Sequence, residues 1–182
     1  MKNKLLMKNE NGFTLIEVIV VAGIIAILAG ILVPLILKEI DESRITRAYG
    51  DVKSISSAIL VFKKDTAQWP ALDETCNPNI TLLSGSGSAP GGLGANNWDN
   101  SLERTINEQL PEDANGCYNN WKGSYIPYVS ADPWGNRYVI NADKFADTDR
   151  PVWIMSAGPN ETIDTNAEDA EVAGDDVGLR IQ

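Results

Sequence analysis

The feature that most constrains this chain is an uncharged, apolar run of 20 residues, Val18 to Leu37, close to the amino terminus. As an α-helix the run would be about 30 Å long, which matches the hydrocarbon core of a bilayer. Three lysines, Lys2, Lys4 and Lys8, precede it, so the positive-inside rule predicts that residues 1–12 are cytoplasmic and that the body lies across the membrane. A secretory signal peptide is the alternative, but the run is too long and no small-x-small cleavage site follows it.

The body that follows is acidic. The formal charge of the whole chain is −10, and it becomes −12 without the first twelve residues, which hold three lysines and one glutamate. So acidic a body gives no electrostatic footprint for nucleic acid. The chain has no histidine, which removes the commonest acid–base group from any catalytic proposal. It also lacks a Gly-rich phosphate loop and a clustered nucleophile–base pair, which disfavours a membrane-anchored enzyme or binding module.

A short motif, Gly12-Phe13-Thr14-Leu15-Ile16-Glu17, directly precedes the apolar run. Glu17 is an ionisable group in apolar surroundings, which is costly and usually needs a partner, although the headgroup boundary would also accommodate it. Behind a short basic leader, the motif resembles the class III signal of type IV pilins and type II secretion pseudopilins. The resemblance implies that a membrane prepilin peptidase cuts after Gly12 and methylates the new amino terminus at Phe13. It also implies that Glu17 is the assembly residue, which neutralises the ammonium group of a neighbouring subunit.

Pro34 lies near the end of the apolar run, where the same family commonly has a proline. Pro34 removes the amide that would bond the carbonyl of Gly30, so we expect a kink or local unwinding there. Gly and Pro are also commoner in membrane helices in general.

After the apolar run, apolar side chains recur at three- and four-residue steps, which predicts an amphipathic helical half over 38–66. They are Ile45, Tyr49, Val52, Ile55, Ile59 and Phe62. With the transmembrane half, 13–37, this segment would form one helix of about 50 residues whose stripe packs on the body. One span is poorly suited to a channel and well suited to bundling with copies of itself.

The segment 73–123 is expected to be irregular and particular to this chain, except for a short helix at 101–110 capped by Asn100. Cys76 and Cys117 lie within this segment. Two free buried thiols are one possibility, but a body outside the cytoplasm favours a disulfide between them. The absence of histidine argues against a catalytic cysteine.

The β signal dominates after Gly123. Three short antiparallel strands are predicted, at 125–129, 137–140 and 152–155, forming a sheet over 125–155 that lies on the helix. The ordered motifs of the body resemble the major pseudopilin of type II secretion. They are Trp69-Pro70, Asp132-Pro133-Trp134-Gly135-Asn136, Ser156-x-Gly158-Pro159 and Asp175-Asp176-x-Gly178. The resemblance implies an α+β, type IV pilin-like fold with a globular head over 38–182.

The carboxy-terminal loop, 156–178, is rich in carboxylates, which can hold a hard cation such as calcium. A solvated, disordered acidic tail is the alternative. The resemblance to major pseudopilins favours calcium and places the ligands on residues of this loop. They are the main chain of Ala157, the side chain of Asn160 and the closing acids Asp175 or Asp176. Asp164 or Glu161 would supply the charge that Asn160 lacks.

The sequence therefore predicts a structural subunit of a helical filament, most consistent with the type II secretion pseudopilus. A type IV pilus subunit for adhesion, motility or surface electron transfer is the alternative. The resemblance implies further copies of the chain, the prepilin peptidase, an inner-membrane assembly platform, minor pseudopilins and the lipid bilayer as partners. The chain would cross the inner membrane once before assembly and lie in a periplasmic or cell-surface filament afterwards.

Overall fold

The computed structural model describes residues 12–182, so the predicted leader lies outside the described residues except for Gly12. The chain divides into two compact units, with the boundary between Ile40 and Asp41. The first unit is the apolar helical segment. The second, which we call the head, runs from Asp41 to Gln182.

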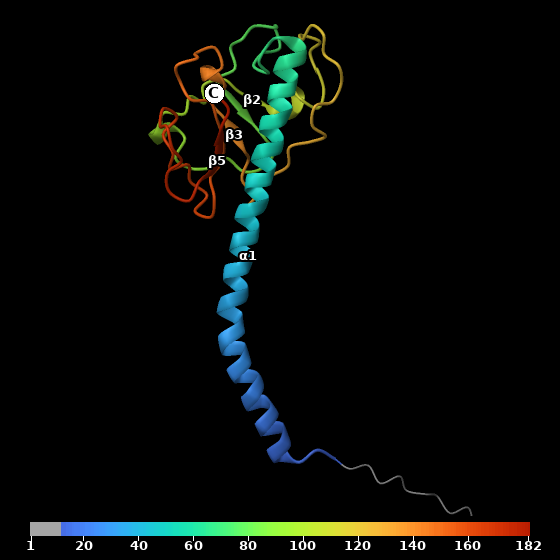
Figure 1. The fold of residues 1–182 in the computed structure, drawn as a ribbon, viewed down its shortest axis with the longest axis vertical. Helices are drawn as coiled ribbons and strands as arrows, with labels where there is room; N and C mark the ends of the chain where they lie inside the picture. Colours follow the sequence, from blue (N-terminus) through green and yellow to red (C-terminus); the bar gives the residue numbers. More distant parts are fainter. Residues whose placement is uncertain (1–11) are drawn as a thin grey trace, which may run out of the picture. The chain divides into compact units, whose positions relative to one another are not determined.

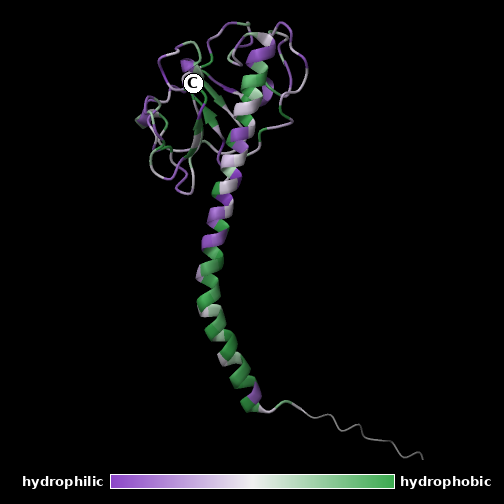
Figure 2. Cartoon of the chain, viewed as in Figure 1, coloured by the Kyte–Doolittle hydropathy of each residue, from purple (hydrophilic) through white to green (hydrophobic). Residues whose placement is uncertain are grey.

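One helix, α1 (Leu15–Thr66), is 52 residues long and contributes to both units. Its first half is hydrophobic and its second half is mixed (Figure 2). Every residue from Gly12 to Arg47 is exposed, and by length and composition α1 is able to cross a membrane. Apolar side chains are unfavourable in water. The first half of α1 therefore requires lipid or other protein chains around it.

Pro34 lies inside α1, and the helix is continuous on both sides of it. The predicted local unwinding at Pro34 is therefore absent. The kink at Pro34 stays a prediction. At the other end, the Thr66 hydroxyl donates to the carbonyl of Phe62. Ala67 then takes a left-handed conformation with φ of 59°, which is a common way for a helix to end.

Five short strands form the sheet of the head, in the order β2-β1-β3-β4-β5 (Figure 1). They are β1 (Leu82–Ser84), β2 (Glu103–Thr105), β3 (Val139–Ile140), β4 (Trp153–Ser156) and β5 (Val177–Arg180). β1 and β2 are parallel, and the other neighbouring pairs are antiparallel. The predicted α+β fold is confirmed. The sheet, however, is mixed rather than antiparallel, and it takes strands from 73–123 and from the carboxy terminus as well as from 125–155.

Two segments differ from their predictions because side chains satisfy the backbone in unexpected ways. The expected helix at 101–110 is instead β2 followed by a 3-10 turn, η2 (Ile106–Glu108), which the Thr105 side chain caps. The expected strand at 125–129 is not part of the sheet, and Val129 bonds to the Asn107 side chain as well as to the amide of Ser86. The Asn107 Oδ1 accepts from the amide of Val129 at 2.7 Å, and its Nδ2 donates to the carbonyl of Val129 at 3.1 Å.

Side chains alternate between the two faces of the sheet along each strand. Each face packs against its own hydrophobic core. On β4, Ile154 packs in the core that includes α1, whereas Met155 packs in a second core on the opposite face. Loops carrying Trp98, Ile163 and Ala167 contribute to this second core. The acidic carboxy-terminal segment is therefore a packed layer of the head and not a free tail. Two further 3-10 turns, η1 (Gly94–Asn96) and η3 (Ala142–Lys144), lie in the connections.

Candidate functional site

α1 begins with a capping box formed by Thr14 and Glu17. The Glu17 Oε2 accepts from the Thr14 amide at 2.8 Å and from the Thr14 hydroxyl at 2.7 Å. The Thr14 hydroxyl in turn accepts from the amide of Glu17 at 3.4 Å. This capping role was not predicted from the sequence, although Thr-x-x-Glu ahead of an apolar run is the usual signature of a capping box.

Glu17 keeps one carboxylate oxygen available. Both bonds from Thr14 end on Oε2, and no residue that the structure describes donates to Oε1. Apolar side chains line a hollow beside the carboxylate: Phe13, Val18, Val21, Ala22 and Ile25. A carboxylate in apolar surroundings needs a cationic partner or contact with water. This end of the helix can therefore cap itself and bind a cation from another molecule at the same time.

Cys76 and Cys117 form the predicted disulfide, with their Cα atoms 5.2 Å apart. One end lies in a tight loop organised by Asp73, whose Oδ1 accepts from the amides of Thr75 and Asn77 and from the Thr75 hydroxyl. These hydrogen bonds, that of the Thr75 hydroxyl foremost, lower the pKa of Asp73. The bridge ties two loops of the head together, which is a structural role for both cysteines.

The structure brings together three of the residues that the calcium hypothesis named. The backbone N–H of Asn160 donates to Asp175 Oδ2, and its side-chain Nδ2 donates to Asp164 Oδ2, both at 2.9 Å. Asp176 is more buried, and its Oδ2 accepts from two backbone amides of the loop. Ala157 follows β4 and is fully buried.

The chemistry of this loop suits a hard cation, which prefers carboxylate, amide and carbonyl oxygens. Asp176 Oδ1 is buried and has no hydrogen-bond partner among the described residues. Burial raises the pKa of this carboxyl group, although the loop amides oppose the rise; a bound cation would favour the ionised form. No three acidic side chains within residues 12–182 converge as a metal cluster. Asn160 and backbone carbonyls would therefore have to complete the ligand set.

A buried carboxylate that the sequence did not reveal joins the turn before β3 to the acidic loop. Asp132 Oδ1 accepts from the amides of Trp134 at 3.0 Å and Asn136 at 2.8 Å. Its Oδ2 accepts from the Ser156 hydroxyl at 2.6 Å, and that hydroxyl accepts from the amide of Gly158 at 3.3 Å. Asp followed by Pro signals an Asx-type turn. The partnership with Ser156 depends on the fold and has no local signal.

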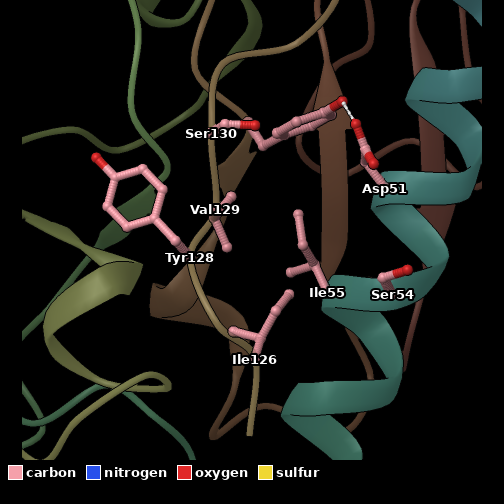
Figure 3. Close-up of a pocket in the computed structure, with 8 residues that line it drawn as sticks. Asp51, Ser54, Ile55, Ile126, Tyr128, Val129 and Ser130 are labelled. Atoms are coloured by element: carbon pink, nitrogen blue, oxygen red, sulfur yellow. Dashed lines mark hydrogen bonds between the residues drawn. The ribbon is translucent and has the colours of Figure 1, made fainter. Parts of the chain in front are cut away.

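Asp51 points from α1 toward the sheet (Figure 3). Its Oδ2 accepts from the Tyr138 hydroxyl at 2.9 Å and lies 3.7 Å from Nε of Arg47. Burial, and next the hydrogen bond to Asp51, raise the pKa of Tyr138, so the phenol stays protonated and donates. The adjoining cavity of about 60 Å³ holds at most a few water molecules. These side chains therefore fasten α1 to the sheet and do not form a substrate site.

The single apolar helix, its capped acidic start and the small sheet that covers its second half together define a type IV pilin-like subunit. Residues 7–33 match the prokaryotic N-terminal methylation motif, and residues 103–175 match type II secretion system (T2SS) protein G. The chain is therefore similar to T2SS protein G over residues 103–175 and carries the methylation motif at its amino terminus.

Several proteins with the name of core protein G are similar to this chain over most of their length. The type II secretion system core protein G of Pseudomonas aeruginosa is 26% identical over 165 residues, which cover 91% of this chain and 94% of the relative. That of Escherichia coli (strain K12) is 29% identical over 157 residues, 86% of each chain. That of Vibrio cholerae is 27% identical over 177 residues, 96% of this chain and 92% of the relative. No solved structure matches this chain.

Proposed function

We propose that this chain is a structural subunit, and not an enzyme, of the pseudopilus of a type II secretion system. The observation that carries the proposal is the exposed apolar half of α1, which begins with a glutamate that keeps one oxygen free. Such a helix needs apolar neighbours and one cation for each subunit. Identical copies supply both, because a mature amino terminus is an ammonium group beside an apolar surface.

The match of residues 103–175 to protein G favours secretion over a type IV pilus, because it lies in the head. The chain would cross the inner membrane once, with its amino terminus in the cytoplasm, and then move into a filament in the periplasm. Its partners would be further copies, minor pseudopilins and an inner-membrane assembly platform. The leader would be removed by a prepilin peptidase.

The mature chain is expected to begin at Phe13 with a methylated amino group. Replacing Gly12 with Val should block processing almost completely, because a branched side chain would then stand directly before the cleaved bond. Intact-mass measurement and amino-terminal sequencing of the chain from cell membranes test this result. Gly23→Val, the same substitution inside the span, serves as the control and should be processed normally. A mature chain that still begins at Met1 contradicts the proposal.

We also propose that the carboxy-terminal loop binds calcium through Asn160, Asp164, Asp175, Asp176 and the carbonyl of Ala157. A bound calcium ion would supply positive charge to the buried Asp176 and cross-link the loop. Calcium at about 100 times its dissociation constant should stabilise the head by about 2.7 kcal/mol, or roughly 5–10 °C in Tm.

Thermal unfolding of the purified full-length chain in detergent, with calcium and then with chelator, measures this shift. Asp175→Ala should abolish the shift, whereas Asp149→Ala, at an exposed position outside the loop, should preserve it. The absence of bound metal together with an unchanged Tm would overturn the calcium proposal and leave the structural function intact.

A further inference from the structure

The head part of α1 has an exposed side that faces away from the sheet. Val52, Ile59 and Phe62 are fully buried on the core side. The exposed side, which we call the outer face, follows three- and four-residue steps. It consists of Gly50, Lys53, Ser57, Leu60, Val61 and Lys64. Leu60 is 47% exposed and Val61 is 50% exposed, so an aliphatic patch on this face has no cover within the head.

The outer face is basic although the chain as a whole is strongly acidic. The acids on α1 nearest to it are engaged elsewhere: Asp51 bonds to Tyr138, and Asp65 pairs with Lys122 at 3.0 Å. Lys64 forms no ion pair with any residue in the described part of the chain. The face therefore combines unneutralised positive charge with exposed aliphatic surface.

A surface of the opposite character lies in the carboxy-terminal loop, at residues 168–172, which we call the acidic tip. All five of its residues, Glu-Asp-Ala-Glu-Val, are exposed. Glu168 pairs with Arg150 within the chain, whereas Glu171 is in no ion pair among the residues that the structure describes. The next residue, Val172, is 39% exposed. The tip thus offers an unpaired carboxylate beside an exposed aliphatic side chain.

The acidic tip has a fixed conformation, so little ordering would be needed for it to bind. The Trp153 Nε1 donates to the carbonyl of Asp169 at 3.1 Å, and Ala173 donates from its amide to the Thr165 hydroxyl at 3.0 Å. Ala167, directly before the tip, is fully buried. A surface that is already ordered binds with a smaller loss of conformational entropy than a mobile tail does.

The tip and the outer face of one chain lie on opposite sides of the head. The loop before the tip packs on the face of the sheet opposite to α1, and in Figure 1 the orange-to-red loops and α1 flank the strands. Two complementary surfaces on opposite sides cannot meet within one molecule. Between copies they give a heterologous contact, and such contacts generate open helical filaments when the rotation does not close.

We infer that the acidic tip of one subunit docks on the outer face of α1 in a neighbouring copy, with Glu171 bound to Lys64 and Val172 packed on Leu60 and Val61. The inference rests on the proposed function, which supplies the copies. It also addresses a difficulty of the filament, because subunits of net charge −12 repel one another. Placing the acidic tip on the basic face turns part of that repulsion into attraction.

Charge reversal in the full-length chain tests the contact in cells that form filaments. Lys64→Glu and Glu171→Lys should each lower the yield of sheared filaments at least about fivefold, because each places like charges at every repeated contact. The chain carrying both substitutions should recover most of the yield, since the pair is restored with exchanged signs. The matched control is Glu112→Lys, at an exposed position of the head outside the tip, and it should leave the yield unchanged.

Filament yield is counted by electron microscopy, and Tm in detergent shows that each variant is folded. Recovery in the doubly substituted chain supports the contact. Single reversals that behave like Glu112→Lys overturn it, and so do single losses that the double substitution does not repair. Both of these results leave the proposed function standing, because filaments still form from the wild-type chain. Absence of wild-type filaments under every export condition would overturn the proposed function and this contact together.

Discussion

Replacing Glu17 with Ala is expected to abolish filament formation while the protein remains in the membrane. In the proposed filament each subunit brings an ammonium group into apolar surroundings, and the free Oε1 of Glu17 in a neighbour neutralises it. An unpaired charge in such surroundings costs on the order of 3 kcal/mol or more. At about 1.4 kcal/mol per tenfold change, the yield of sheared filaments should fall at least about a hundredfold, as counted by electron microscopy.

Two matched variants separate the charge of Glu17 from its place in the capping box. Glu17→Gln keeps a side chain that can complete the box but removes the charge, and it should fail as Glu17→Ala does. Thr14→Ala removes the cap at a cost of about 1 kcal/mol but keeps the carboxylate, and it should still form filaments. Filaments from Glu17→Gln would show that capping is the role of this residue. Loss of a secreted protein from the medium in the same strains would separate secretion from a pilus function.

The elements that depend on local periodicity could be predicted from the sequence. The three- and four-residue spacing predicted the buried side of α1 from Val52 to Phe62, which is buried. Ile45 and Tyr49, at the start of the predicted stripe, are each 41% exposed. The apolar first half was equally evident, because 20 consecutive uncharged residues match the length of a helix that crosses a bilayer. The disulfide followed from the compartment that this segment implied.

The parts that depend on distant partners could not be predicted. β1 and β2 have three residues each, too few for an alternating pattern to stand out from the surrounding loop. The β-forming side chains at 125–129 favoured a strand, but Val129 bonds instead to the side chain of Asn107 and to the amide of Ser86. The prediction for the acidic loop was based on its charged residues alone. Its position is determined by Ile163 and Ala167, which are fully buried.

Asp132→Ala is expected to cause the largest loss of stability of any single change in the head outside its apolar core. Asp132 is 4% exposed and accepts from two backbone amides and the Ser156 hydroxyl. Its removal would leave buried donors without acceptors and would loosen the turn before β3 from the acidic loop. Such losses typically cost about 3–5 kcal/mol. Thermal unfolding of the full-length chain in detergent should show a fall in Tm of roughly 10 °C.

The control for this change is Asp149→Ala, because Asp149 is exposed. It should shift the free energy of unfolding by less than about 0.5 kcal/mol. Asp132→Asn is the informative intermediate: its remaining carbonyl oxygen can accept from the turn amides, while its NH₂ group would face the Ser156 hydroxyl, which already accepts from Gly158. Its stability should therefore lie between those of the wild-type chain and Asp132→Ala. If Asp132→Ala proved as stable as Asp149→Ala, the turn and the acidic loop would have to be held by packing alone, and Asp132 would not connect them.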